Sequence, residues 1–143
     1  MKLQTHRFGE IDINEEGIIT FPNGLPGFEE LTKFIFIQES AEQSFAYMQS
    51  VEDGDVSFII VNPFLFFEDY EFDLSDEEQA ELQIENADDL NIWSIMNVTD
   101  SLENATLNLL APIIVNFKAR LGKQIIIQNT SYQTKHFLNL NRG

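Results

Sequence analysis

The chain has 143 residues, of which 43% are hydrophobic, and it carries a formal net charge of -16. This length and apolar content are enough to bury a sizeable core, so we expect one domain spanning residues 1–143. The strong negative charge disfavours direct binding to nucleic acid or anionic lipid and favours basic protein partners.

Short β-branched and aromatic runs recur along the chain with turn residues between them, a pattern typical of β-strands. In chain order, we expect strands at Ile11–Ile13, Gly17–Phe21, Lys33–Ile37, Phe45–Met48, Ser57–Val61, Ile92–Val98, Leu107–Asn116 and Gln124–Gln128. This pattern predicts an all-β fold, an antiparallel sandwich or closed pseudo-barrel of many short strands with one short helix. Pro112 should mark a strand start, an edge or a bulge, because proline cannot donate to a ladder.

A loop rich in proline and glycine separates the second and third expected strands. Its two prolines fix φ, whereas Gly24 and Gly27 are free to take positive φ. We therefore expect a rigid double turn whose flanking aromatic residues, Phe21 and Phe28, anchor both ends in the core.

Eleven aspartates and glutamates fall in the 22 residues from Glu68 to Asp89, which we call the acidic segment. Within it, Ser75 and Glu78 have the spacing of a capping box and predict the start of a helix. In that helix Ala80 and Ile84 should face the core, which would leave most of the acids in water.

An apolar run, Phe64–Phe67, directly precedes the acidic segment. Desolvated aromatic anchors usually dominate the energy of protein interfaces, while charges at the rim steer encounter. In a strand Phe64 and Phe66 would share one face and could form such an anchor. Burial of both faces of the run in the core is the alternative.

The sequence shows none of the common patterns of a catalytic or metal centre. The two histidines, His6 and His136, lie near opposite ends of the chain, and there is no cysteine. No glycine-rich phosphate loop is present, and abundant carboxylates alone do not indicate a catalytic pair. We expect no enzyme activity and no cofactor or metal. The N-terminus has no apolar stretch of signal-peptide length and no run is long enough to span a membrane, so we expect a cytoplasmic protein.

Several motifs are spread in order along nearly the whole chain. The most specific are the Phe-Pro-x-Gly-x-Pro-Gly-Phe-Glu stretch at residues 21–29 and the Asn-Leu-x-Ala-Pro-Ile stretch at residues 108–113. The others are Phe8-Gly9, Ile19-Thr20, Asn62-Pro63, Asp69-Tyr70 and Gln124. With these motifs the chain resembles the bacterial flagellar assembly factor FliW family.

The resemblance implies a cytoplasmic, non-enzymatic pseudo-barrel protein that switches between two partners. One is the small, basic RNA-binding dimer CsrA, which represses translation of flagellin mRNA, and the other is flagellin before its export. Binding to CsrA away from the RNA site relieves the repression.

We assign two groups of candidate residues to these roles. The candidate partner-binding residues are Phe64, Phe66, Glu68, Asp69, Glu71, Asp73, Asn108 and Pro112. The candidate RNA-repelling acids, which would lie beside the approaching RNA, are Asp76, Glu77, Glu78, Glu81, Glu85, Asp88 and Asp89. The structural alternatives are a solvated helix and loop for the acids, a bulged core strand around Asn108 and Pro112, and a tight turn for the loop at residues 22–27.

Two other functions are compatible with the same composition. The first is an acidic nucleic-acid mimic that occupies the phosphate-binding groove of a basic protein and competes directly with RNA. The second is a small enzyme or sugar-binding module that uses carboxylates in a β cleft, for which a strongly raised carboxyl pKa would be the sign.

Overall fold

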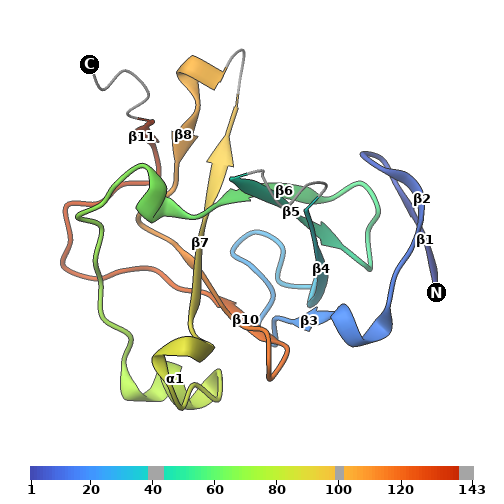
Figure 1. Cartoon of the computed structure of the whole chain (residues 1–143), viewed down its shortest axis with the longest axis horizontal. Coiled ribbons are helices and arrows are strands. Elements are labelled where there is room, and N and C mark those ends of the chain that lie inside the picture. Colours follow the sequence, from blue (N-terminus) through green and yellow to red (C-terminus); the bar gives the residue numbers. More distant parts are fainter. Residues whose placement is uncertain (39–43, 99–101, 139–143) are drawn as a thin grey trace.

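The computed structural model describes residues 1–38, 44–98 and 102–138, and its strands form a two-stranded hairpin and one large sheet (Figure 1). The strands are β1 Lys2–Thr5, β2 Gly9–Asp12, β3 Ile19–Thr20, β4 Lys33–Ile37, β5 Phe45–Ser50, β6 Ser57–Val61, β7 Asn91–Asn97, β8 Thr106–Leu107, β9 Ile113–Asn116, β10 Leu121–Gln124 and β11 His136–Phe137. The helices are α1 Asp76–Glu81 and the 3-10 turns η1 Glu15–Gly17, η2 Pro63–Leu65, η3 Ala87–Asp89 and η4 Leu102–Asn104.

The large sheet closes on itself. Its strand order is β11-β8-β7-β6-β5-β4-β3-β10-β9, and a further pairing of β7 with β9 joins the two ends of a ring of seven strands. Every strand pairing in the described parts of the chain is antiparallel except the single bridge between β10 and β3 at Leu121 and Thr20. The predicted all-β pseudo-barrel with one short helix is therefore confirmed.

The core of the ring is aromatic and aliphatic. Phe21 and Phe34 are fully buried and pack edge to face with ring centroids 5.3 Å apart. Met48, Ile60 and Ile113 complete the centre of this cluster from three other strands or their ends. Alternating residues of the strands face inward because successive side chains of a strand point to opposite sides.

The loop after β3 folds as the predicted double turn, but only one of its ends is buried. Gly24 and Gly27 both take positive φ, and Phe21 is fully buried, as expected. Phe28 is 40% exposed and contacts Phe58 at the surface, so its prediction as a core anchor was wrong. Leu25 enters the core in its place, because the turn reverses the chain between Leu25 and Phe28.

Only the strands predicted at Lys33–Ile37 and Ser57–Val61 have their observed bounds, and the other six predicted strands differ. Four of the six correspond to β2, β3, β5 and β7 with shifted ends, namely those predicted at Ile11–Ile13, Gly17–Phe21, Phe45–Met48 and Ile92–Val98. The expected strand at Leu107–Asn116 is two strands, because a turn intervenes in which Asn108 accepts a hydrogen bond from the Ala111 amide at 3.0 Å. Strand β9 then begins directly after Pro112, as expected for a proline at a strand start. The last predicted strand, Gln124–Gln128, overlaps β10 only at Gln124, so its prediction over residues 125–128 was wrong, and β1 and β11 were not predicted.

Candidate partner-binding face

The acidic segment is folded against the barrel along its length. Tyr70, near its start, is buried, and its hydroxyl donates to the Leu109 carbonyl oxygen at 2.7 Å. Burial, with a smaller contribution from Tyr132, raises the pKa of the Tyr70 phenol, which keeps the hydroxyl a donor. The next amide, that of Glu71, donates to the Tyr132 hydroxyl at 3.1 Å. These contacts tie the beginning of the acidic segment to the turn before β9 and to the C-terminal part of the chain.

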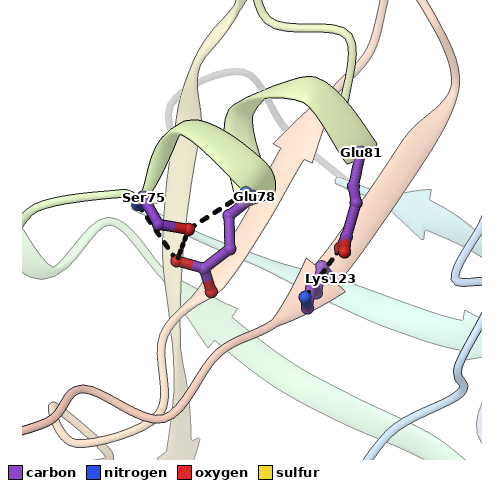
Figure 2. Close-up of polar contacts among 4 residues, drawn as sticks. All are labelled: Ser75, Glu78, Glu81 and Lys123. Atoms are coloured by element: carbon purple, nitrogen blue, oxygen red, sulfur yellow. Dashed lines mark hydrogen bonds and ion pairs between the residues drawn. The ribbon is translucent and has the colours of Figure 1, made fainter.

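Helix α1 begins where the capping box predicts (Figure 2). The Ser75 hydroxyl accepts from the Glu78 amide at 3.0 Å, and the Glu78 carboxylate accepts from the Ser75 amide at 3.2 Å. At the other end of the helix, Glu81 forms a salt bridge of 2.7 Å with Lys123 of β10. The helix is thereby attached to the barrel by one of the cations that follow the acid-rich part of the sequence.

The residue that anchors the helix in the core is not the predicted one. Ala80 is exposed, whereas Leu82, the residue that follows α1, is buried beside Ile114. The helix ends earlier than the predicted pattern, so the core-facing position falls on its C-cap. Ile84 packs against the same cluster, as expected.

Asn116 and Asp89 hold the chain after α1. The side-chain amide of the buried Asn116 donates through Nδ2 to the Leu82 and Gln83 carbonyl oxygens at 2.9 and 3.1 Å. The Asp89 carboxylate accepts from the Glu85 and Asn86 amides at 3.1 and 3.2 Å. These two hydrogen bonds, with a smaller contribution from Lys118, hold the pKa of Asp89 below its usual range.

Most of the eleven acids of the segment face water. The half-buried ones are Glu78 and Asp89, and both accept hydrogen bonds from backbone amides. The exposed ones are Glu68, Asp69, Glu71, Asp73, Asp76, Glu77, Glu81, Glu85 and Asp88. Nine of the fifteen sequence-predicted site residues are therefore exposed carboxylates that lie within one segment of the chain.

A groove separates the acidic segment from the chain after β10. We call it the acid-rimmed groove. It has a volume of about 900 Å³ and is lined on one side by residues 71–75 with Glu78 and on the other by residues 125–130. Glu71 and Asp73 stand exposed at its rim, while Phe72 and Leu74 pack inward. The isoleucine at the opposite wall, Ile126, is 54% exposed.

The predicted aromatic anchor is not a strand. Residues 63–65 form the 3-10 turn η2, in which the Asn62 side chain accepts from the Phe64 amide at 2.9 Å. Phe64 and Leu65 are 36% and 58% exposed, whereas Phe66 and Phe67 pack against the core. The predicted alternative, burial of both faces of the run, is therefore wrong, because the turn places two consecutive side chains outward.

Asn108 belongs to the turn before β9 and Pro112 is the last residue before that strand, and neither is exposed. Pro112 is buried and Asn108 is half-buried. Asn108 borders a second, smaller groove of about 330 Å³, which we call the neutral groove because no charged residue lines it. Its lining is Leu25, Pro26, Phe28, Phe58, Ile95, Asn108, Leu110, Ala111, Gln124, Ile126 and Thr134. The two most specific sequence motifs meet at this groove.

Ile126 lines both grooves, and no pattern in the sequence indicated a functional role for this residue. The Ile125–Ile127 run looks like the interior of a buried strand. Only the arrangement of the strands shows that Ile125 enters the core while Ile126 does not.

Replacing Ser75 with alanine should destabilise the protein by about 1 kcal/mol, because it removes a cap whose hydroxyl satisfies an amide of the first helical turn. Chemical denaturation of both proteins measures this difference. The matched control is Ser131→Ala, at an exposed serine outside the helix, which should change the unfolding free energy by less than about 0.5 kcal/mol. Equal effects of the two substitutions would contradict the role of the capping box.

Two absences hold for residues 1–38, 44–98 and 102–138, the part of the chain that the structure describes. No group of three histidine, aspartate or glutamate side chains in these ranges could hold a metal ion. No helix there is long and apolar enough to cross a membrane. His136 accepts from the Gln133 amide through Nε2 at 2.8 Å and contacts the rings of Phe67 and Tyr132.

Comparison with known proteins gives consistent similarities over the whole described chain. A family model described as "FliW protein" matches residues 2–138. The flagellar assembly factor FliW of Alkaliphilus metalliredigens is 45% identical over 139 residues, which are 96% of this chain and 86% of that protein. FliW of Bacillus subtilis is 41% identical over 136 residues, 95% of each chain. A crystal structure of the flagellar assembly factor FliW superposes with a TM-score of 0.90 at 40% identity and covers 96% of both chains.

Proposed function

Since this chain belongs to the FliW family of flagellar assembly factors, we propose that it is a cytoplasmic, non-enzymatic regulator that binds CsrA and flagellin alternately. In this proposal CsrA represses translation of flagellin mRNA, and binding of the present protein relieves the repression. Export of flagellin frees the protein to bind CsrA. Flagellin synthesis thus follows the capacity for export.

The observation that supports CsrA binding most strongly is the set of exposed carboxylates beside the acid-rimmed groove, whose lining also includes apolar side chains. A basic RNA-binding dimer is attracted by the net charge of -16, and the carboxylates concentrate that charge at one face. The groove supplies apolar area, which charge pairs alone lack. We propose that Glu68, Asp69, Glu71 and Asp73 contact CsrA, with Phe64 as an exposed aromatic neighbour.

The acids farther along the segment would act on RNA without touching its site. We propose that Asp76, Glu77, Glu85 and Asp88 project beside the RNA path of bound CsrA and lower its positive potential. Nucleic-acid affinity depends steeply on phosphate neutralisation, so a nearby negative face can release RNA from a site that stays open. Glu78, Glu81 and Asp89 belong to the same face but also hold the fold together.

The geometry of the two grooves supports mutual exclusion of the partners. Ile126 lines both, so a protein seated in one groove covers part of the other. We propose that CsrA uses the acid-rimmed groove and that flagellin uses the neutral groove, where Asn108 lies and Phe28 is exposed. Exclusion at one shared residue would make the two bindings alternate without a conformational change.

The charge also supports the rival proposal of a nucleic-acid mimic. A mimic would occupy the phosphate-binding groove of its partner and compete directly with RNA. Its affinity would fall steeply with salt, because it would rest on charge alone.

Calorimetric titration with purified CsrA distinguishes the two proposals. At ~50 and ~500 mM salt, we expect binding that weakens but persists, because the apolar contact is not screened. With CsrA already holding a flagellin-leader RNA, the protein should lower the apparent number of RNA-competent sites without raising the RNA concentration needed for half-saturation. Binding at low salt alone, with direct RNA competition, would favour the mimic. No binding at either salt would remove the CsrA proposal.

A further inference from the structure

The chain after β10 offers an unpaired backbone edge. The amides of Ile125 and Ile127 donate to the carbonyl oxygens of Pro112 and Leu110 at 3.1 and 2.9 Å. In an extended chain the backbone N–H and C=O groups of successive residues point to opposite sides. The backbone groups of Ile126 therefore point away from Pro112 and Leu110. Among the residues that the structure describes, the Ile126 amide has no hydrogen-bond acceptor, and its carbonyl oxygen accepts only a 3.4 Å bond from the exposed Gln128 side chain.

This edge opens into the acid-rimmed groove. Six consecutive residues, 125–130, line one wall of the groove, so backbone as well as side chains borders it. The facing wall, residues 71–75, is likewise a non-helical stretch of consecutive residues. Asn129 takes a positive φ of 54° and turns the chain away, which limits the open edge to the positions around Ile126 and Gln128.

The negative charge of the groove walls favours a positively charged occupant. Glu71, Asp73 and Glu78 line the groove, and its lining contains no lysine or arginine. Leu74, Phe72 and the isoleucines of the opposite wall give it an apolar floor. A chain seated there gains charge complementarity from basic side chains and buries apolar ones on its other face, because side chains alternate along a strand.

We propose that the acid-rimmed groove takes a basic, extended segment of the partner protein, which adds as a strand to the edge at Ile126 and Gln128. The inference rests on the proposed function for the identity of the partner and adds the manner of its recognition. Main-chain hydrogen bonds to the edge supply affinity in this arrangement, and alternate side chains supply specificity. Glu71 and Asp73 pair with the basic side chains of the added strand.

Backbone amide hydrogen exchange in the complex with CsrA tests the proposal directly. We expect exchange at Ile126 and Gln128 to slow on binding. The amides of Ile125 and Ile127 are an internal control, since both are already hydrogen-bonded in the free protein and should be protected in both states.

Proline substitution at Ile126 separates the contribution of the backbone amide to binding from that of the side chain. Ile126→Pro removes an amide that has no partner within the fold, and an edge position tolerates proline. Its affinity for CsrA should fall about fivefold relative to Ile126→Ala, which loses the same side chain but keeps the amide. Thermal unfolding checks that both variants are folded, and the exchange measurement on the unaltered protein stands if either is not.

The outcomes separate this inference from the function on which it rests. If CsrA binds and exchange at Ile126 and Gln128 is unchanged, strand addition is overturned while CsrA binding stands. If CsrA does not bind, the peptide acetyl-Lys-Val-Lys-Val-Lys-amide replaces it as the probe. Hydrogen exchange is then measured at the same two backbone amides, those of Ile126 and Gln128. Slowed exchange that is lost in the Glu71→Gln, Asp73→Asn double variant then supports a basic strand site. Unchanged exchange overturns it.

Discussion

Neutralising four exposed acids should let RNA rebind to CsrA about tenfold more tightly in the presence of this protein, with CsrA affinity changed by less than about threefold. The variant combines Asp76→Asn, Glu77→Gln, Glu85→Gln and Asp88→Asn. These side chains are exposed and lie beyond the proposed contact residues. Glu78, Glu81 and Asp89 are left intact because they cap or tether the helix region.

The magnitude follows from Coulomb's law. A carboxylate and a phosphate about 10 Å apart in water repel by about 0.4 kcal/mol before screening, so four such pairs give about 1.6 kcal/mol, close to a factor of ten. Screening at physiological salt, where the Debye length is about 8 Å, would reduce this value to about 0.5 kcal/mol. The tenfold effect is therefore expected at about 0.01 M ionic strength, where the Debye length is about 30 Å. The measurement is a titration of labelled flagellin-leader RNA into CsrA that is saturated with the variant or with the unaltered protein.

A charge-matched control separates location from net charge. Asp12→Asn, Glu15→Gln, Glu30→Gln and Asp55→Asn also remove four exposed acids, but outside the acidic segment. This control should leave RNA exclusion within about twofold of the unaltered protein if the acidic segment lies nearest the RNA. Equal recovery of RNA binding in both variants would show that only the total charge matters. No recovery in either would contradict the electrostatic mechanism.

Gly122→Ala should destabilise the fold by about 3 kcal/mol, because the added methyl group would overpack a filled core. Gly122 lies within β10 opposite Val115, and a Cβ there would come within 2.5 Å of Cζ of Phe21. The Phe21 ring is fully buried and packed edge to face on Phe34, so it has no space to move into. Equilibrium denaturation in urea measures the loss.

Two companion variants test whether the steric contact is the cause. Gly17→Ala adds the same methyl group where no atom lies within 4 Å and φ is not positive, and it should be neutral or slightly stabilising. Phe21→Leu shortens the obstructing ring, so the double variant with Gly122→Ala should lose less than the sum of the single losses by at least about 1 kcal/mol. Simple additivity would show that Phe21 is not the obstacle.

Local sequence patterns predicted the elements that rest on local physics. The strands at Lys33–Ile37 and Ser57–Val61 were predicted to the residue, because alternating β-branched and aromatic residues favour an extended chain. The start of α1 was predicted because a capping box is satisfied within four residues of Ser75. The helix end was missed, since nothing in the local pattern indicates that Leu82 is the residue which reaches the core.

Features that depend on neighbours distant in sequence were the ones that local patterns missed. Phe28 is as apolar as Phe21, yet one is exposed and the other buried, because the turn between them brings Leu25 inward instead. The short strands β1 and β11 form only because β2 and β8 lie beside them. Closure of the ring likewise requires β7 to pair with β9 as well as with its neighbours β6 and β8.

The sequence by itself determined the chemistry of the candidate face and its family. Eleven acids in 22 residues fix the charge of that face wherever the fold places it, and the two proline-containing motifs carry the resemblance. Only the tertiary structure decided what lies beside those acids. The acid-rimmed groove and the unpaired edge at Ile126 arise because β10 pairs with β9 on one side while its continuation leaves the other side open. Such an edge is a property of pairing between strands, and no single strand's sequence records it.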